Sequence, residues 1–537
     1  MTFDRGGAQM GRGVQMRGGA VPMRGRGVRM RGGAVRMRGG GVRMRGGLMH
    51  QDMPVAAAAD DGDDDDDRDD DDRSDDYENE QERPDDDDVQ PDEWVNKEFN
   101  WVPAGDQYEP ERHAFTGQSG IQVDTTNFSA LQYFELFFNG DFVNHLVIQT
   151  NLYAAQYLDA NPNLPPYSDA RRWQPTNPRE MKEFIGLMLL MGIIHKPYTD
   201  LYWSLDNLYD TPIFRQTMPR LRFRLLLRFL HFNDNTNAPN ARDPDRDRLF
   251  KVRPLLDHFF EMFQNIYVPE GDISIDESLL LWKGRLLFRQ YIPMKRARFG
   301  IKVFCLCETS GYTFRFKVYC GKEDPFLEMD GLLPDCVLGF SKAERTVLYL
   351  AHPLLDAGYT IYMDNYYTTP RLFAYLHSRS TMACGTLRLN KVPREIRQTN
   401  VPQDGMIVRR AGSLLLIKFK DKKDVHMLTT AQDGSAQMVR VRGRRGRGAP
   451  VQQKMKPTAV IAYNANMGGV DKQDQMLQPY SAARKSLKWY RKLGIHVIQV
   501  ALLNAHILYQ KDGGRNPFLR FCHDVSEIFL FYLLFIT

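Results

Sequence analysis

The stretch between residues 271 and 391 restricts the fold more than any other part of the chain. Three strand-like runs come first, followed by a helix, a strand, a helix and a strand. We expect the strands at residues 273–276, 301–307, 312–319, 359–363 and 381–389, and the helices at residues 341–357 and from Pro370 onward. This alternation predicts an α/β domain built around a central sheet.

Four aspartates stand at notable places in this pattern. Asp276 and Asp364 each close a β-branched or aromatic run, which places a charge at the end of a buried strand. Asp471 and Asp474 are three residues apart, which puts both carboxylates on one helix face. Taken singly, each aspartate is equally well explained as a cap or turn residue. Together they favour a site for Mg²⁺, because this ion prefers carboxylate oxygens and two such ions can act on one phosphodiester.

Ordered sequence blocks surround these aspartates. They are Ser274-Ile-Asp-Glu-Ser278, Tyr291-Ile-Pro-Met-Lys295, Phe299-Gly-Ile-Lys302, Met363-Asp-Asn-Tyr-Tyr-Thr-Thr369, Gly385-Thr-Leu-Arg-Leu-Asn-Lys391, Ala462-Tyr-Asn464, Met467-Gly-Gly-Val-Asp-Lys-Gln-Asp-Gln475 and Ala483-Arg-Lys-Ser-Leu-Lys-Trp-Tyr490. In this order they resemble the piggyBac transposase family and the domesticated proteins derived from it. The resemblance covers about residues 125–515.

The resemblance implies an RNase H-like catalytic core in which the strands ending at Asp276 and Asp364 lie side by side. It implies that Asp276, Asp364 and Asp471 are catalytic, that Asp474 is an accompanying acidic ligand, and that these four bind two Mg²⁺ or Mn²⁺ ions. Asn365 is expected near the active site. The implied activity is cut-and-paste DNA transposition at TTAA sites, carried out on double-stranded DNA by a nuclear homodimer.

Basic and aromatic residues near the C-terminal end favour contact with DNA. Lysine and arginine neutralise phosphates, and tryptophan stacks on unpaired bases. The candidates are Arg484, Lys485, Lys488 and Trp489, followed by Arg491 and Lys492. By resemblance, Trp489 lies close to the active site, and Arg388 and Lys391 approach target DNA. The alternative is an amphipathic helix whose tryptophan belongs to the core.

Residues 126–270 are predicted to be helical, and the resemblance implies that they serve dimerisation and DNA binding. We expect Asp141 to cap one helix, Pro178 to start a second that runs to residue 191, and Thr217 to cap a third over residues 221–232. The third helix carries Arg220, Arg222, Arg224 and Arg228. These arginines either contact DNA or lie on a solvated face.

Residues 392–455 interrupt the α/β pattern and predict a β-rich insertion. Strands are expected at residues 406–409, 413–419 and 425–429. The insertion ends in Arg440-Val-Arg-Gly-Arg-Arg-Gly-Arg447, a flexible basic loop that suits phosphate binding, nuclear import or plain solvation. Residues 456–480 return to the catalytic domain, and residues 481–537 complete the helical domain. The apolar run 528–536 is too short for a membrane span and is expected to be a buried terminal helix.

The first 93 residues carry two opposed charges and little that forms a core. Residues 1–50 have a net charge of +10 and a seven-residue Met-Arg-Gly-Gly repeat, while residues 51–93 have −20. Both segments are predicted to be disordered, with residues 94–125 as a linker. The arm is typical of RNA- or single-strand-binding segments, or is a low-complexity expansion without a role. The remaining chain carries +14, as expected of a protein that binds a polyanion.

Cysteine is sparse, and its spacing predicts no structural zinc. The six cysteines include no Cys-x-x-Cys, and Cys305 and Cys307 are two residues apart in an apolar strand. We expect buried thiols and a reducing compartment. Many members of the piggyBac family end in a cysteine-rich zinc module, which this sequence lacks.

These observations predict a piggyBac-like DDE DNA transposase without a membrane role. The alternative is a domesticated nuclear DNA-binding protein that no longer transposes. A third possibility is an RNA-binding role led by the arginine-rich arm.

Overall fold

The structure is a computed structural model that describes residues 98–105, 108–240, 243, 246–293, 295, 297–321, 339–442, 451–483, 486 and 488–531. The arginine-rich arm, the acidic tract, Cys336, Arg484, Lys485 and most of the basic loop lie outside these residues. The predictions made for those parts of the chain therefore stay predictions.

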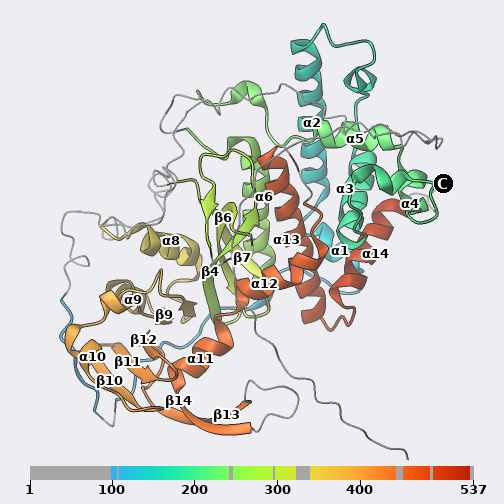
Figure 1. Ribbon diagram of the computed structural model, residues 1–537. Helices are drawn as coiled ribbons and strands as arrows, with labels where there is room; N and C mark the ends of the chain where they lie inside the picture. The colour runs from blue at the N-terminus through green and yellow to red at the C-terminus, as the bar shows by residue number, and fades with distance from the viewer. Residues whose placement is uncertain are drawn as a thin grey trace, which may run out of the picture. The chain divides into compact units, whose positions relative to one another are not determined.

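A mixed sheet, ten-stranded within the described residues, forms the centre of the fold (Figure 1). Its order is β1 (Val102–Pro103), β10 (Met406–Ala411), β11 (Leu414–Lys420), β12 (Asp424–Thr429), β9 (Met382–Thr386), β8 (Thr360–Met363), β4 (Asp272–Leu281), β6 (Phe299–Glu308) and β5 (Gln290–Tyr291). β7 (Thr313–Val318) also pairs with β6. β4, β8 and β9 run parallel to one another, whereas the other pairs are antiparallel. The predicted α/β order is confirmed, and β6 and β7 form a hairpin across Thr309-Ser-Gly311.

The interior strands are apolar because both faces of the sheet are covered. β6 is buried from Gly300 to Glu308, and every residue of β7 is buried. Helix α6 (Arg253–Ile266) packs on β7, while α12 (Gly469–Leu477) packs on β4 and β6. Cys305 and Cys307 are buried free thiols, as predicted.

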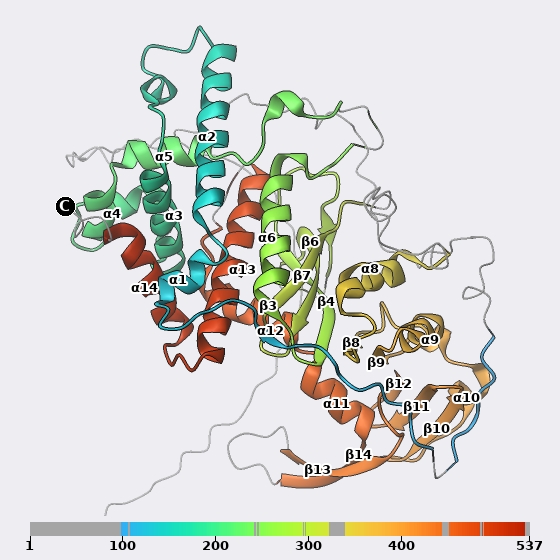
Figure 2. The same cartoon turned by 180° about the vertical axis from the view of Figure 1, so that it is seen from behind.

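The remaining helices lie around this sheet (Figures 1 and 2). They are α1 (Ala130–Glu135), α2 (Gly140–Ala160), α3 (Pro178–Ile193), α4 (Pro212–Thr217), α5 (Arg220–Phe229), α8 (Lys342–Ala351), α9 (Pro370–Ser378), α10 (Arg394–Gln398), α11 (Thr458–Asn466), α13 (Trp489–Lys511) and α14 (Phe518–Phe531). Short 3-10 turns occur at Asp169–Arg172, Thr199–Trp203, Asn235–Asn237, Phe250–Val252, His352–Leu354, Leu389–Lys391 and Gln478–Tyr480.

Two predicted helix starts are wrong. Asn139, rather than Asp141, caps α2: its side-chain oxygen accepts the backbone N–H of Phe142 at 2.9 Å. Asp141 lies in the first turn, where a negative charge is also favourable. Thr217 ends α4 instead of capping α5, because Pro219 holds an extended backbone immediately before α5 begins. The start of α3 at Pro178 is confirmed.

The insertion contains the predicted strands, but these strands extend the central sheet. β12 pairs with β9 through Leu428 opposite Gly385, so β10, β11 and β12 continue the order begun by β4, β8 and β9. Only β13 (Ala436–Arg442) and β14 (Val451–Pro457) form a sheet of their own. Residues 406–429 are therefore part of the same layer that carries Asp364.

The linker is partly structured along the sheet. β1 pairs with the edge strand β10, and β2 (Gly120–Ile121) pairs with β3 (Tyr267–Val268) ahead of β4. Between them, the ring of Phe115 meets Tyr359 edge to face at 4.9 Å. The linker thus covers strand ends that would otherwise be open to solvent.

Two C-terminal helices complete the core. Within the described residues, α13 alone is long and apolar enough to cross a membrane, yet 83% of its most apolar window is buried inside the protein. It contacts α1, α6, α12 and α14, as a core helix does. α14 packs on α3, and Phe529 is buried, which confirms a buried helix as far as residue 531.

Candidate active site

The sheet register brings Asp276 and Asp364 to neighbouring positions. Ile275 on β4 is the parallel partner of Met363 on β8, and each aspartate is the next residue along its strand. The adjacency implied by the family resemblance is therefore confirmed. Backbone pairing fixes the register of the two strands. The Cα positions of the two aspartates are therefore set by the sheet itself and do not depend on contacts at the protein surface.

The turn after β8 fixes the Asp364 backbone and carboxylate. The backbone N–H of Tyr366 donates to Asp364 Oδ1 at 2.9 Å, and the Thr368 hydroxyl donates to the Asp364 carbonyl at 2.7 Å. Gly385 on β9 permits this packing, since a Cβ there would lie 2.3 Å from Thr368 Oγ1 and 2.7 Å from Met363 O. On β4, the N–H of Glu277 donates to Asp276 Oδ1 at 2.8 Å.

Helix α12 brings the second pair of carboxylates against the sheet. Its first residue is Gly469, where a Cβ would lie 2.6 Å from both Glu308 O and Ser274 Oγ, so the helix approaches β4 and β6 closely. The Ser278 hydroxyl then donates to Asp474 Oδ1 at 2.6 Å. Asp471 is exposed instead, although both acids were predicted to share one helix face.

Burial and neighbouring negative charges raise the pKa values of three of these carboxyl groups. Burial, followed by the neighbouring Glu277 carboxylate, raises the pKa of Asp276 above its usual range, and Asp364 adds to the effect. Burial chiefly raises the pKa of Asp364, and Glu277 contributes again. Burial also raises the pKa of Asp474, with a further contribution from Asp471. Burial and neighbouring acids thus disfavour the ionised forms of these three carboxyl groups, and a nearby cation would favour them.

The donor set fits Mg²⁺. All the candidate ligands are carboxylates, the oxygen donors that Mg²⁺ takes, and a bound cation would offset the repulsion that raises their pKa values. The oxygens of Asp276, Asp364 and Asp471 do not all lie within 4.8 Å of one another. One or two carboxylates per ion suffice, however, because Mg²⁺ keeps water and substrate phosphate as its other ligands. Among the described residues, only His523, Asp524 and Glu527 on α14 meet that distance limit.

Two charged residues at the site were not among the predicted site residues. Lys295 donates its ammonium to the Glu277 carbonyl at 2.7 Å, and its charge lowers the pKa of both Asp276 and Asp474. Glu277 accepts a hydrogen bond from Tyr367 at 3.3 Å and acts on both strand aspartates. Both residues lie in the sequence blocks that resemble the piggyBac family. Their place in those blocks was the sequence signal that could have identified them as site residues.

The predicted basic pair lies beside Asp364. Arg388 donates through Nε to Asn365 Oδ1 at 3.2 Å, and its charge lowers the pKa of Asp364. Lys391 donates to the Thr368 carbonyl at 3.1 Å, and burial lowers the pKa of Lys391 to about 8. The structure thus brings Arg388, Lys391 and Asn365 together on the turn that carries Asp364.

The C-terminal basic residues divide into different environments. Trp489 is half-buried at the start of α13, with Phe288 edge to face at 5.4 Å. Lys488 immediately precedes it and is half-buried as well. Arg491 and Lys492 are buried, and Arg491 donates to the carbonyls of Arg228, in the last turn of α5, and Leu230, just after it. The last two residues therefore belong to the core, contrary to their interpretation as DNA contacts.

The arginines of α5 make contacts within the protein. Arg222 forms two hydrogen bonds with Glu180, at 2.6 and 2.5 Å, and lies 4.7 Å from the Trp173 ring. Arg228 donates to the Tyr157 hydroxyl at 2.8 Å. Arg220 forms an exposed ion pair with Asp200 at 3.2 Å. These contacts attach α5 to its neighbours, and DNA contact by α5 remains a prediction.

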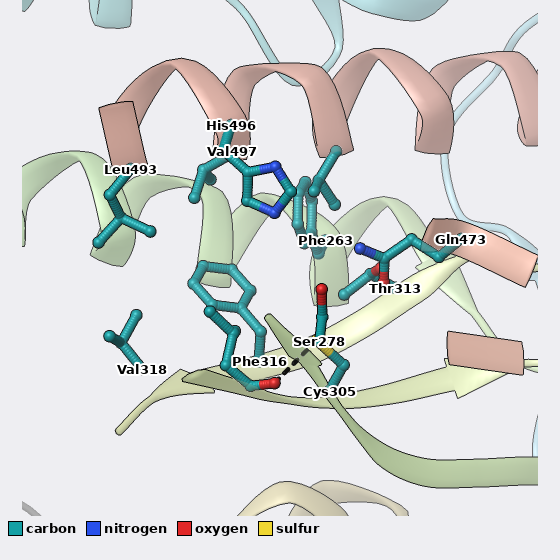
Figure 3. Close-up of a pocket in the computed structure, with 12 residues that line it drawn as sticks. Phe263, Ser278, Cys305, Thr313, Phe316, Val318, Gln473, Leu493, His496 and Val497 are labelled. Atoms are coloured by element: carbon teal, nitrogen blue, oxygen red, sulfur yellow. Dashed lines mark hydrogen bonds between the residues drawn. The ribbon is translucent and has the colours of Figure 1, made fainter. Parts of the chain in front are cut away.

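A small cavity lies behind Ser278, between the sheet and α13 (Figure 3). It has a volume of about 20 Å³, enough for one water molecule, and is bordered by Ser278, Gln473, Thr313 and His496 among apolar side chains. Thr313 donates to Gln473 Oε1 at 2.8 Å, which ties α12 to β7. Burial, with a smaller effect from Lys492, lowers the pKa of His496 to about 4, so this ring is neutral near pH 7.

Comparison with known proteins identifies the family. A family model described as Transposase IS4 matches residues 129–506. The human PiggyBac transposable element-derived protein 2 is 26% identical over 389 residues, covering 70% of this chain and 61% of that protein. The human PiggyBac transposable element-derived protein 3 is 28% identical over 362 residues, covering 64% of this chain and 58% of that protein. This chain thus spans about three fifths of the length of these relatives.

A solved structure agrees with the sequence relatives. The piggyBac transposase in a synaptic complex with hairpin DNA matches with a TM-score of 0.63 and 26% identity, covering 77% of this chain and 83% of that chain. The match to the family model covers well over half of the present chain. The chain belongs to the piggyBac transposase family.

Proposed function

We propose that this protein is a metal-dependent DNA transposase that cuts and joins strands at TTAA sites through an RNase H-like core. The observation that carries the proposal is the parallel register of β4 and β8, which sets Asp276 beside Asp364 with α12 packed against the same strand. Membership of a transposase family and a structural relative solved with hairpin DNA support it.

In this proposal Asp276, Asp364 and Asp471 are the catalytic ligands, and Asp474 supports them. Mg²⁺ or Mn²⁺, as two ions held by these carboxylates, would activate water or a 3′-hydroxyl and stabilise charge on the scissile phosphate. The charge of Lys295 offsets the repulsion that Asp276 meets from Glu277 and Asp364 and that Asp474 meets from Asp471. Asp474 is held by Ser278 and so fixes the angle at which α12 presents Asp471 to the substrate.

The proposed substrate is double-stranded DNA, bound in the nucleus by a homodimer. Arg388 and Lys391 neutralise phosphates next to Asp364, and Arg484, Lys485, Lys488 and Trp489 are the further proposed DNA contacts. RNA binding by the N-terminal arm is a separate activity that the proposal does not require.

The second candidate function is a domesticated DNA-binding protein that no longer transposes. It is favoured by the names of the human relatives, which are transposable element-derived proteins. The intact set of four aspartates favours the enzyme instead. The two candidates share the DNA contacts and differ in catalysis.

Nicking of supercoiled plasmid DNA that carries TTAA sites tests the enzyme. We expect the full chain to nick the plasmid in Mg²⁺ but not in EDTA. Asp276→Asn and Asp364→Asn should each lower the rate by at least about a hundredfold, since metal-ion catalysis supplies several kcal/mol.

Asp272→Asn is the matched control, because Asp272 lies on the same strand, is exposed, and accepts a hydrogen bond from Tyr362 at 3.0 Å. It should nick like the unaltered chain. DNA binding without Mg²⁺-dependent nicking would reject the enzyme in favour of the domesticated protein.

A further inference from the structure

The strands β13 and β14 form a two-stranded ribbon outside the central sheet. Each strand has seven residues, and the register runs from Ala436 opposite Pro457 to Arg442 opposite Val451. Figures 1 and 2 show the ribbon beneath α11 in both views, set apart from the main sheet. Nothing in the proposed chemistry at the aspartates accounts for an element of this length.

The two faces of the ribbon differ in exposure. Met438, Arg440, Gln453 and Met455 are exposed and form one face, because alternate residues point to the same side of a strand. We call these four residues the open face. On the other face, Val439, Lys454 and Lys456 are half-buried, and Gln437, the partner of Lys456 near the base of the ribbon, is exposed. Met438 and Met455 are direct partners across the strands and remain 58% and 41% exposed.

The base of the ribbon is fixed to the rest of the protein. On the half-buried face, Lys454 lies 3.4 Å from Asp404 and 3.9 Å from Asp421, at the ends of the β10–β11 hairpin. The Thr458 N–H donates to the Ser435 carbonyl at 2.9 Å and closes the two strand ends. The open face therefore points away from the sheet in a defined direction.

The ribbon is also connected to the aspartates. Thr458 is the first residue of α11, which contacts β4 and β9 and leads directly into α12 with Asp471 and Asp474. Tyr463 on α11 lies close enough to Asp364 and Asp276 for their charges to raise its pKa further, after burial. A ligand on the ribbon would thus be held on the element that positions two of the four acids.

The charge of the ribbon indicates an anionic partner. Its two strands contain Arg440, Arg442, Lys454 and Lys456 and no acidic residue. The eight residues that join the strands in the sequence add three more arginines. A dense positive charge on a narrow element is the electrostatic pattern of a nucleic-acid contact.

We propose that the open face of the β13–β14 ribbon lies in the major groove of duplex DNA, a binding role that rests on the proposed function. Seven residues per strand give a ribbon about 23 Å long, and the major groove is about 12 Å wide and admits a two-stranded ribbon. Arg440 meets phosphate, and Gln453 reaches base edges, as glutamine does with adenine. Met438 and Met455 supply apolar contact of the kind that thymine methyl groups accept.

Two other occupants are weaker. Double-stranded RNA has a deep and narrow major groove that side chains cannot enter, so a protruding ribbon suits DNA better. The acidic tract of this chain, with a net charge of −20 over residues 51–93, complements the charge of the ribbon. The acidic tract has no groove, however, that could receive the paired side chains of Met438 and Met455. Both alternatives are outcomes of the test.

The test compares two single-charge changes on opposite faces of the ribbon. Arg440→Ala removes a charge from the open face, and Lys456→Ala removes one from the half-buried face. Binding of the full chain to a duplex of about 30 base pairs, three helical turns with a central TTAA, is measured across salt concentrations. We expect Arg440→Ala to reduce the salt slope by about 1, while Lys456→Ala leaves it unchanged. Equal slopes for both variants and the unaltered chain would overturn the proposal.

Cross-linking supplies a measurement that does not depend on affinity. The five cysteines in the described residues are buried, so Met438→Cys introduces an accessible thiol there. Duplex DNA with a thiol-reactive tether on a thymine should couple to Met438→Cys and not to Lys456→Cys. Cross-linking at both positions or at neither contradicts the assigned face. So does equal competition by double-stranded RNA of the same length, or an Arg440→Ala effect that appears only after residues 51–93 are deleted.

The same measurements on the Asp276→Asn chain separate the two proposals. If nicking fails in the unaltered protein but the Arg440→Ala slope change persists, the ribbon binds DNA and the enzyme is rejected. If nicking occurs with Arg440→Ala at the unaltered salt slope, the enzyme stands and the ribbon proposal is rejected.

Discussion

The strand-borne and helix-borne carboxylates are positioned by different forces. Asp276 and Asp364 follow paired residues of two parallel strands, so backbone hydrogen bonds in the interior of the sheet set their spacing. Asp471 and Asp474 depend on the packing of α12, through the close approach at Gly469 and the bond from Ser278 to Asp474. The first pair persists as long as the sheet exists, whereas the second requires one helix to remain docked.

The helix-borne pair is itself divided. Asp474 is held against the sheet by Ser278, while Asp471, one turn earlier, is exposed and open to a ligand. Equal spacing in the sequence thus produced unequal environments. We infer that Asp474 positions the helix and that Asp471 contacts the catalytic metal ion. Loss of Asp471 should therefore reduce activity, whereas loss of the contact to Asp474 should reduce stability.

The largest expected effect follows from that division. Asp471→Ala should lower Mg²⁺-dependent nicking by about a hundredfold, yet change the free energy of unfolding by no more than about 0.5 kcal/mol, as for other exposed positions. Ser278→Ala should lower the free energy of unfolding by about 2 kcal/mol, because the buried Asp474 carboxylate loses its donor. Plasmid nicking and urea denaturation measure the two quantities.

Gln475→Ala is the matched control on α12, since Gln475 is exposed and lies outside the site. It should change neither quantity. If Asp471→Ala destabilised the protein as much as Ser278→Ala does, the two acids would share one structural role and the division would be wrong.

The strand-borne half of the site was predictable from the sequence, and the helix-borne half only in part. An apolar run that ends in aspartate indicates a buried strand with a charge at its end, and Asp364 follows that rule. The predicted end at Asp276 is wrong, because β4 continues through this residue to Leu281. The adjacency of the two aspartates came from the family resemblance, because local patterns do not encode which strands pair. The depth of Asp474 depends on how closely Gly469 approaches β6, which is a tertiary property that residue spacing does not contain.

Long-range pairing also explains the larger differences in the fold. The strands of the insertion were recognisable, but their place in the central sheet depends on Leu428 pairing with Gly385, 43 positions earlier in the chain. Arg491 appeared to be a surface cation because its neighbours are basic. Arg491 instead donates a hydrogen bond to the carbonyl of Leu230, which is 261 residues earlier in the chain, and residue spacing does not show that contact.

The second prediction tests how the ionisation of Asp276, on strand β4, affects the stability of the protein. Burial and Glu277 raise the pKa of Asp276 from 3.8 to about 8, so the folded protein holds this proton more tightly than the unfolded chain does. The stability that protonation confers is present at low pH and is lost as the pH rises through that interval. We expect the free energy of unfolding to fall by about 2 kcal/mol between pH 5 and pH 8 without divalent ions, less than full burial would imply because water relaxes the buried charge.

Mg²⁺ should reverse this loss at pH 8, since it binds the ionised carboxylates of the folded state and not the unfolded chain. Asp276→Asn should remove most of the pH dependence, whereas Asp272→Asn should retain it. Thermal unfolding at several pH values, with and without Mg²⁺, provides the measurement. Stability that increases toward pH 8 in the absence of metal would show that Asp276 is not a strained acid.

The smallest expected effect concerns Lys295, which acts on both halves of the site. Its charge lowers the pKa of strand-borne Asp276 and of helix-borne Asp474. Lys295→Met should raise both values and move the acidic limb of the pH–rate profile for nicking upward by about one unit. Lys283→Met is the matched control, because Lys283 is exposed on the connection between β4 and β5, whereas Lys295 lies on the next connection, between β5 and β6. If the two variants gave the same profile, Lys295 would not couple the strands to the helix, and the two carboxylate pairs would titrate as independent sites.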